Sequence, residues 1–355
     1  MTKIVFKNML LAVGCLIANM AFCACSSSSD TDDDLDLGGN DIEEGIQNGQ
    51  ETAASQIDLD SMVQYCQRDT FKIYGKLYRP KNITGRIPAV ILSHSSSLTH
   101  AAMKSYAINI AKKGIATYCF DFCGGSSASQ SSGSTDSMTV FTEVEDLRAV
   151  VENIRSLDFV NPDSLFLLGS SQGGLVTALL SEEIADKVCG QILFYPAFNI
   201  PDMVKQFGGT TGGSGTTGSW GDWGDFGNLG DWGDFGDLGD WSDLIGSWGD
   251  AGGMTGMTSM SKKYIESIKD FDVWSHIGTY KKPVTIVHGS SDIIVAPSYS
   301  EKAVEKYGSN AKLYLIEGAN HGFNADNLGS MGAMMGATTD YDSKVMPYVY
   351  KALNR

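Results

Sequence analysis

Positive charge is scarce in this chain. Its 355 residues include 26 Lys and Arg against 42 Asp and Glu, which gives a formal net charge of −16. Removal of residues 1–24, interpreted below as a signal, takes away Lys3 and Lys7 but no acid, so the remaining chain carries −18. Such an excess of negative charge repels nucleic acids and anionic membranes. We therefore expect no nucleic-acid partner.

Metal-ligand spacings are also lacking. The seven cysteines form no C-x-x-C pair, and no spacing of Cys and His is typical of a zinc site. Three cysteines lie in or end the signal segment, and the others permit disulfides without fixing a pairing: Cys66, Cys119, Cys123 and Cys189. Cys119 ends a predicted inner strand and Cys123 lies in the turn after it, which favours buried free thiols. We predict no metal and no cofactor.

A hydrophobic run long enough to cross a membrane is missing too. Residues 9–22 are apolar, but roughly 20 residues are needed to span a bilayer. With Lys3 and Lys7 before it, this run is typical of a secretory signal peptide. The residues that lead up to Cys25 resemble a loose lipobox, in which Cys25 is lipidated and becomes the first mature residue. Cys15 is a rival site that leaves a very short apolar stretch.

Residues 25–56 are polar, acidic and free of aromatic side chains, a composition that predicts a disordered tether. The serine and aspartate run at residues 26–34 resembles the export signal of surface lipoproteins in some Gram-negative bacteria, although a plain solvated tether has the same composition. We expect an exported protein, lipid-anchored in the outer membrane, that faces the cell surface or the periplasm. Its contact with the membrane is then through the lipid anchor only. The sequence leaves the oligomeric state open.

Residues 57–355 are long enough for one large hydrophobic core. Short apolar runs predict strands at about residues 71–78, 87–93, 115–121, 164–168, 190–195, 284–288 and 311–316. Helices are predicted at about residues 100–113, 141–157, 173–183, 298–307 and 340–353. Strands that alternate with helices indicate a parallel sheet, and such sheets bind ligands at the carboxyl ends of their strands.

The most informative pattern is Gly-Ser-Ser-Gln-Gly at residues 169–173, which follows an apolar strand at 165–168 and precedes a helical stretch at 175–180. Strand, G-x-S-x-G and helix together place a serine side chain at the end of a sheet. That serine is Ser171. The backbone N–H of Gln172 then opens the helix and is directed at an anion site.

A candidate acid and a candidate base follow in order. Residues 284–287 form a buried-strand pattern that leads to Asp292, and a second apolar strand leads to His321. The order Ser171, Asp292, His321 is that of serine hydrolases with a G-x-S-x-G turn. A lone serine in a glycine-rich turn, or a lone Asp that caps a helix, would be structural. The joint order, each residue after its own apolar strand, favours catalysis.

These residue types suit nucleophilic catalysis. A serine hydroxyl is a weak nucleophile until a base such as His321 takes its proton, and Asp292 would orient that histidine and stabilise its imidazolium. Two backbone N–H groups would bind the oxyanion, one from Gln172 and one from Ser96, at the end of the strand at 87–93. The other histidines fall into two groups: His94 and His288 are predicted to be structural hydrogen-bonders, whereas His100 and His276 have no assigned role.

Residues 71–325 resemble a bacterial α/β-hydrolase subgroup related to feruloyl and cinnamoyl esterases and to the prolyl-oligopeptidase and dienelactone-hydrolase-like families. The matching segments are residues 120–126, 138–143, 169–174, 195–202 and 319–323. The resemblance implies an α/β fold with a mostly parallel eight-stranded sheet wrapped by helices, and ester hydrolysis through an acyl-enzyme. Dienelactone hydrolases proper use a cysteine nucleophile, so Ser171 argues against that chemistry. Many relatives have glycine after the histidine of the oxyanion strand, where this chain has Ser95, whose Cβ is expected to crowd the turn.

The tract at residues 207–257 repeats Gly-Asp-aromatic or Gly-Asp-Leu triplets and holds five of the six tryptophans. A period of three suits neither a helix nor a strand. Related esterases carry a lid at this place, so a lid that offers aromatic surface to the substrate is one interpretation. A disordered low-complexity expansion is an equal alternative. A calcium-ordered repeat is a third alternative, but the spacing of the tract does not match the known nonapeptide calcium motifs.

Taken together, the sequence predicts a serine hydrolase that cleaves carboxylic esters, either acyl or feruloyl esters linked to polysaccharide or small short-chain esters. A prolyl-oligopeptidase-like serine peptidase is one alternative, although no propeller domain fits before residue 71. A cell-surface binding lipoprotein with a vestigial hydrolase core is the other, and the three triad residues argue against it.

Overall fold

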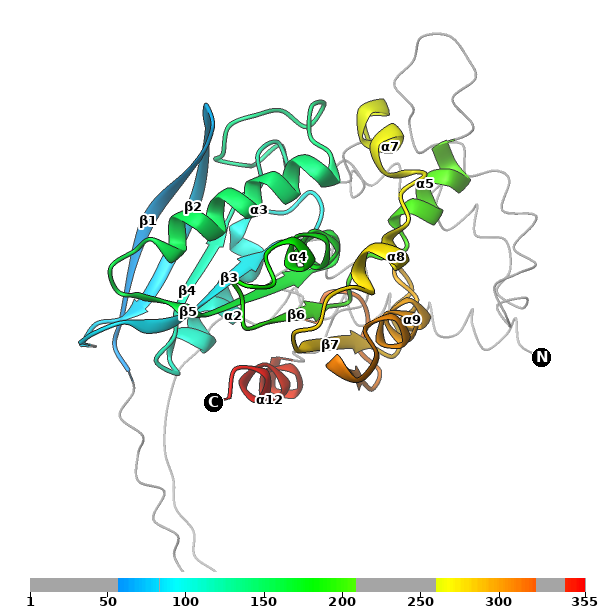
Figure 1. Ribbon diagram of the computed structural model, residues 1–355. Helices are drawn as coiled ribbons and strands as arrows, with labels where there is room; N and C mark the ends of the chain where they lie inside the picture. The colour runs from blue at the N-terminus through cyan, green and yellow to red at the C-terminus, as the bar shows by residue number, and fades with distance from the viewer. Residues whose placement is uncertain (1–56, 83, 209–259, 324–341, 355) are drawn as a thin grey trace, which may run out of the picture. The chain divides into compact units, whose positions relative to one another are not determined.

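The computed structural model describes residues 57–82, 84–208, 260–323 and 342–354 (Figure 1). The predictions for the signal peptide, for lipidation of Cys25 and for the acidic tether at residues 25–56 lie outside these residues. So does nearly all of the repeat tract, because the description stops at Gly208 and resumes at Met260. Among the described residues, no helix combines the length and the apolar character that crossing a membrane requires.

The described chain is built on an eight-stranded sheet with the strand order β1-β2-β4-β3-β5-β6-β7-β8. The β1–β2 and β2–β4 pairs are antiparallel and the remaining pairs are parallel, so the predicted α/β class and mostly parallel sheet are confirmed. The strands are β1 Leu59–Arg68, β2 Phe71–Pro80, β3 Ile87–Ser93, β4 Ala116–Phe120, β5 Val160–Ser170, β6 Gly190–Phe194, β7 Val284–Gly289 and β8 Ala311–Ile316.

Burial along the strands follows their place in the sheet. All residues of β4 and β6 are buried, as expected for strands covered on both faces. The β1–β2 hairpin lies at one edge, where its tight turn places Asp69 at φ 49°, a left-handed conformation that Asp tolerates. The strand β1 was not predicted, because its residues are mostly exposed or half-exposed and form no apolar run.

Two layers of helices cover the sheet, as Figure 1 shows. One face carries α3, α4, α8 and α9, and the other carries α2 and α12; the apolar core is correspondingly divided into two clusters, one against each layer. The helices are η1 His100–Met103, α2 Lys104–Ala111, α3 Val140–Arg155, α4 Gln172–Glu183, α5 Ile200–Gly208, α7 Lys262–Ile268, α8 Val273–Ile277, α9 Pro297–Tyr307, η2 Gly308–Asn310 and α12 Asp342–Ala352.

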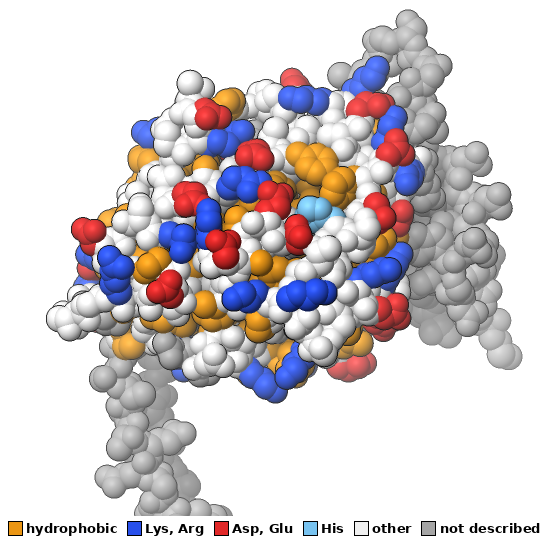
Figure 2. All heavy atoms as spheres, viewed as in Figure 1, with side chains coloured by type: hydrophobic (Ala, Val, Ile, Leu, Met, Phe, Trp, Pro, Cys, Tyr) orange, Lys and Arg blue, Asp and Glu red, His pale blue; other side chains and the backbone are white. Residues whose placement is uncertain are grey.

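Acidic and basic side chains are interspersed on the face of the molecule shown in Figure 2. Two ion pairs join α3 to the segment formed by α4 and the turn after it: Arg148 with Glu183 at 2.6 Å and Lys187 with Glu152 at 2.5 Å. Both pairs are partly exposed, so each contributes at most about 1 kcal/mol to stability.

The predicted free thiols are confirmed for the described chain. All four of its cysteines are free, and Cys119 and Cys123 are buried as expected. Burial raises the pKa of Cys119 to about 12, and burial together with the nearby Asp146 raises the pKa of Cys123 to about 12. Neither thiol is therefore a nucleophile at neutral pH.

Candidate active site

Ser171 stands on a sharp turn between β5 and α4. Its backbone has φ 51° and ψ −119°, a conformation that L-residues rarely adopt and that costs on the order of 1–3 kcal/mol. The turn closes only because its neighbours lack side chains: a Cβ on Gly169 would lie 2.2 Å from the carbonyl oxygen of Gly173, and one on Gly173 would lie 2.4 Å from that of His94. The G-x-S-x-G pattern therefore has a steric origin in this chain.

The three residues predicted as a triad meet at the carboxyl end of the sheet. Nε2 of His321 lies 3.0 Å from Oγ of Ser171, and Nδ1 of His321 lies 2.7 Å from Oδ2 of Asp292. All three are buried, with exposed fractions of 6–8 %. The residues come from three separate strand ends, since Ser171 follows β5, Asp292 follows β7 and His321 follows β8.

Asp292 is held in its ionised form. Its Oδ1 accepts hydrogen bonds from the backbone N–H groups of Ile294 and Val295, both at 2.9 Å. Burial acts to raise its pKa, but the charge of His321 and hydrogen bonds from His288 and His321 outweigh burial and hold the pKa well below the ordinary value of 3.8. A carboxylate at this place fixes the proton of His321 on Nδ1 and leaves Nε2 free to accept the proton of Ser171.

His288 is a part of the site that the sequence pattern does not reveal. The prediction that it is a structural hydrogen-bonder is confirmed, because its Nδ1 lies 2.7 Å from Oγ of Ser300 and its Nε2 lies 2.8 Å from the carbonyl oxygen of Val295. The same Nε2 lies 3.1 Å from Oδ2 of Asp292. A carbonyl can only accept, so Nε2 carries a proton and is shared between the two oxygens.

Tyr195 forms one wall beside the base. Its ring centroid is 4.5 Å from that of His321 and 4.8 Å from that of Phe323. Tyr195 follows β6 directly and has φ 36°, so the backbone bends where this strand ends beside the triad. The sequence placed Tyr195 in a matching segment but gave no sign that it packs on the histidine.

The two predicted oxyanion donors lie at neighbouring strand ends. Gln172 is the first residue of α4, and the first N–H groups of a helix have no partner within the helix. Ser96 lies in the turn after β3, which is closed by a 3.2 Å hydrogen bond from the N–H of Leu98 to the carbonyl of Ser95. Ser95 fits this turn without a positive φ, which falls instead on Ser97 at 59°. The Oγ of Ser95 also lies 3.0 Å from Oγ of Ser170, so its side chain is accommodated and the expected crowding does not occur.

His94 fixes the start of the loop at residues 94–100, which contains Ser96. Its Nδ1 lies 2.8 Å from the carbonyl oxygen of Ser95, and its Nε2 accepts a hydrogen bond from the N–H of Phe122 at 3.1 Å. An imidazole with one donating and one accepting nitrogen is neutral. Burial lowers the pKa of His94, which agrees with that assignment. The prediction that His94 is a structural hydrogen-bonder is therefore confirmed.

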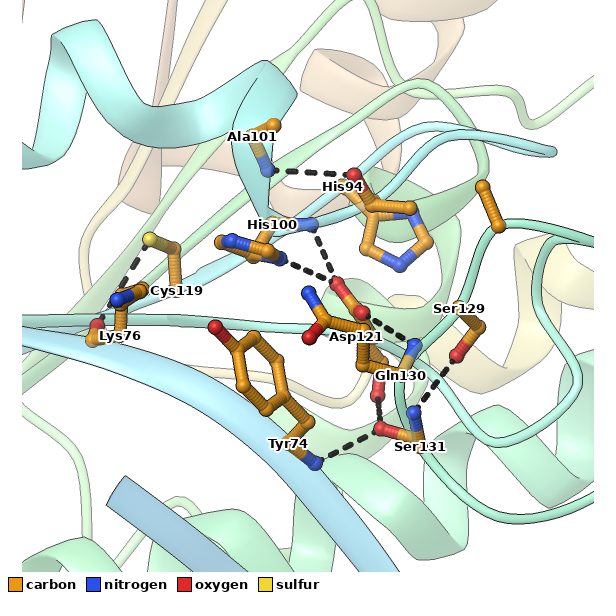
Figure 3. Close-up of polar contacts among 12 residues, drawn as sticks. Tyr74, Lys76, His94, His100, Ala101, Cys119, Asp121, Ser129, Gln130 and Ser131 are labelled. Carbon is orange, nitrogen blue, oxygen red and sulfur yellow. Dashed lines mark hydrogen bonds and ion pairs between the residues drawn. The ribbon is translucent and has the colours of Figure 1, made fainter. Parts of the chain in front are cut away.

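Asp121 holds the other end of the loop, as Figure 3 shows. Its Oδ1 accepts the backbone N–H of His100 at 2.7 Å and lies 2.7 Å from Nδ1 of the same residue, while Oδ2 accepts the N–H of Gln130 at 2.8 Å. Burial acts to raise the pKa of Asp121, but the hydrogen bonds from His100 and Gln130 lower it below its ordinary value. Sequence reasoning gave His100 no role, because its partner lies in a separate segment.

Comparison with known proteins agrees with this architecture. A protein-family profile described as "Serine aminopeptidase, S33" matches residues 87–213. A structure of Est1E from Butyrivibrio proteoclasticus with bound ferulic acid is 24% identical, covers 77% of this chain and 98% of its own and has a TM-score of 0.54. The α/β hydrolase GrgF from Penicillium sp. sh18 is 14% identical, with coverage of 84% and 100% and a TM-score of 0.56.

A third solved structure is the esterase Pf2001 from Pyrococcus furiosus, which is 16% identical, covers 83% of this chain and 93% of its own and has a TM-score of 0.50. No similar sequence was found among curated proteins. The chain thus has the α/β-hydrolase fold, as the sequence predicted, and the family profile that matches residues 87–213 is one of serine hydrolases.

Proposed function

We propose that this protein hydrolyses carboxylic esters through an acyl-enzyme, with Ser171 as nucleophile, His321 as general base and Asp292 as the residue that orients it. The hydrogen-bonded chain Ser171–His321–Asp292, with contacts of 3.0 and 2.7 Å, is the observation that carries this proposal. The strained turn at Ser171 supports it, because backbone strain of this kind clusters at functional sites.

The residues act in a fixed order in this mechanism. Ser171 Oγ attacks the ester carbonyl carbon while its proton passes to Nε2 of His321, and the carbonyl oxygen becomes an oxyanion that the N–H groups of Gln172 and Ser96 stabilise. The C–O bond to the alcohol then breaks as His321 returns the proton to the leaving oxygen. Water repeats the sequence on the acyl-enzyme, releases the acid and restores Ser171.

Two classes of acyl group suit the proposed substrate, aromatic acyl groups and short-chain acyl groups. Est1E holds ferulic acid in its solved structure, and the likeness to it supports an aromatic acyl ester, either free or linked to polysaccharide. Small short-chain esters suit the same chemistry.

Hydrolysis of p-nitrophenyl acetate, butyrate, octanoate and ferulate by wild type and Ser171→Ala tests the proposal. Ser171→Ala should lower kcat by on the order of 10³- to 10⁶-fold. Ser181→Ala is the matched control, since Ser181 is a buried serine on α4 whose hydroxyl, within the described part of the chain, donates only to the carbonyl of Thr177. Equal rates for wild type and Ser171→Ala would refute the proposed nucleophile.

A serine aminopeptidase is the second candidate, because the matching family profile carries that description. Aminoacyl p-nitroanilides separate the two functions in the same assay. Cleavage of these anilides with kcat/KM above that of every ester would favour the peptidase and reject the esterase. The prolyl-oligopeptidase-like alternative is tested by including a prolyl anilide.

We further propose that the protein is exported and anchored by a lipid on Cys25, with residues 207–257 forming a lid or an extension of one. Cys25→Ser should move the expressed protein out of the membrane fraction, and unchanged fractionation would reject the anchor. Removal of residues 207–257 should alter preference among acyl chains more than it lowers the unfolding midpoint. The same preference in both proteins would reject the lid.

A further inference from the structure

A buried carboxyl group lies beside the catalytic turn and takes no part in the proposed triad. Glu143 is on the first turn of α3 and is only 1% exposed. Its Oε2 lies 2.7 Å from Nε2 of Gln172, the residue directly after Ser171. Glu143 therefore contacts the side chain of the same residue whose backbone N–H is the proposed oxyanion donor.

Gln172 is held from a second direction by Tyr264. The hydroxyl of Tyr264, on α7, donates a hydrogen bond to Oε1 of Gln172 at 2.8 Å. Both side chains are 2% exposed. Two buried partners from α3 and α7 thus fix both ends of the Gln172 amide, and an amide that is fixed at both ends cannot rotate without breaking one buried hydrogen bond.

The electrostatic surroundings leave Glu143 protonated at neutral pH. Burial raises its pKa most strongly, the hydrogen bond from Gln172 lowers it, and the charge of Asp146 raises it, with the result that the pKa lies at about 8. Asp146 is itself paired with Arg68 of β1 at 2.6 Å, so that cation is committed to another carboxylate. On α7, burial and the proximity of Glu143 raise the pKa of Tyr264 well above 10, so its hydroxyl remains a donor.

We propose that Glu143 and Tyr264 are positioning residues for the oxyanion hole and act on it through the side chain of Gln172. The inference rests on the proposed function, because it presupposes that the Gln172 N–H stabilises an oxyanion. A core that served packing alone would gain more from an apolar side chain at residue 143, since a buried carboxyl is costly unless it is hydrogen-bonded. The polar contact is instead made to the one residue of α4 that adjoins the nucleophile.

The state of Glu143 should then control turnover at high pH. Below pH 8 the carboxyl is neutral, and the oxyanion develops without a nearby buried charge. As pH rises through about 8, Glu143 ionises and a negative charge appears next to Gln172. A like charge in a buried environment opposes the oxyanion, so the rate of its formation should fall.

The first test compares wild type, Glu143→Gln and Glu145→Gln. Glu145 lies on the same helix but is exposed, so its variant removes the same charge away from the site. We measure kcat for p-nitrophenyl butyrate between pH 6 and 9.5, together with the rate at which an alkyl fluorophosphonate phosphonylates Ser171 with loss of fluoride. Both rates should fall about tenfold above pH 8 in wild type and Glu145→Gln but stay level in Glu143→Gln.

The second test removes one hydroxyl. Tyr264→Phe should lower kcat about five- to tenfold with KM changed less than twofold, because the ester still binds while the oxyanion donor is less well held. Tyr280→Phe is the control, a buried tyrosine from which the same atom is removed. Equal effects of the two substitutions would show a general packing loss and overturn the inference.

The outcomes separate this inference from the proposed function. The fluorophosphonate rate requires Ser171, its base His321 and the oxyanion hole but no ester substrate, so it gives a result even where no ester is turned over. Ser171-dependent reaction with the same alkaline fall in wild type and Glu143→Gln would overturn the role of Glu143 and leave the esterase intact. Phosphonylation without ester turnover would refute the esterase alone, and failure of both reactions would overturn both proposals.

Discussion

Nε2 of His288 lies 3.1 Å from Oδ2 of Asp292, and Nδ1 of His321 lies 2.7 Å from the same oxygen. Two imidazoles therefore share one carboxylate oxygen in the interior. The two histidines differ in what else they touch: His321 reaches Ser171, whereas His288 is tied to Ser300 and to the carbonyl of Val295. His288 thus holds the carboxylate in place, and His321 is left as the only one of the two that contacts the nucleophile.

This arrangement predicts the effect of His288→Asn. The substitution removes the donor to Asp292 but leaves the two backbone N–H groups on its other oxygen, so kcat should fall only about tenfold. The free energy of unfolding should fall by about 1–3 kcal/mol, because the buried hydroxyl of Ser300 loses its partner. Ester kinetics and urea unfolding give the two values. A variant with wild-type kcat would refute a link between His288 and catalysis.

The lowered pKa of Asp292 predicts a pH dependence of stability. In the unfolded chain this carboxyl has its ordinary pKa of 3.8, and in the folded chain the pKa is lower. The group therefore stabilises the folded state above pH 3.8, and this contribution is lost as pH falls through the folded value. Asp292→Asn should cost about 1–3 kcal/mol at pH 6 and flatten the unfolding free energy below pH 4. Parallel acid curves for the two proteins would contradict the prediction.

Glu143 should act on stability in the opposite direction. Its pKa rises from 4.5 to about 8 on folding, so the folded state binds the proton more tightly. The contribution is fully present below pH 4.5 and is lost as pH rises to about 8. Between pH 4.5 and about pH 8, the free energy of unfolding of wild type should fall by about 2–5 kcal/mol relative to that of Glu143→Gln. Urea unfolding at several pH values measures this difference. Glu145→Gln should follow wild type, and a difference between wild type and Glu143→Gln that does not change with pH would refute the buried proton.

The parallel core of the fold could be predicted from sequence because most of its strands coincide with short apolar runs. The runs at 87–93 and 311–316 are observed as β3 and β8 with the same bounds. The strand β3 is buried, and buried parallel strands are nearly continuous apolar runs. The strand β8 lies at the edge of the sheet and is only partly buried, but its Leu-Tyr-Leu-Ile run still predicts a strand. The edge strand β1 could not be found in this way, because mixed polar and apolar residues face solvent there. The short helices α7 and α8 were missed for a different reason, as segments of five to seven residues are too short to establish a helical period.

The candidate site was predictable to the same degree. Ser171, Asp292 and His321 each follow an apolar strand, and parallel strands end at one edge of a sheet, so their meeting follows from topology. The residues that support them carry no such pattern. Glu143 reaches Gln172 from a helix whose sequence shows only amphipathic spacing, and the contact depends on how α3 packs on α4. Contacts of this kind depend on tertiary packing that no spacing rule encodes.

Asp121 provides a last prediction, on the loop that carries Ser96. In Asp121→Asn, the amide oxygen can still accept one backbone N–H, but the amide NH₂ group then faces the other backbone N–H, so two donors meet. The free energy of unfolding should therefore fall by about 2–4 kcal/mol. His100→Ala should cost only about 1 kcal/mol, because the backbone N–H of His100 still reaches the carboxylate. Gln130→Ala is the matched control and should stay within about 0.5 kcal/mol, since only the backbone of Gln130 makes the contact. Because the loop also holds a proposed oxyanion donor, kcat should fall in the same order, with Asp121→Asn most affected. A loss of stability in Asp121→Asn with unchanged kcat would show that the hydrogen bonds of Asp121 do not support the oxyanion hole. That result would reject the role assigned to Ser96.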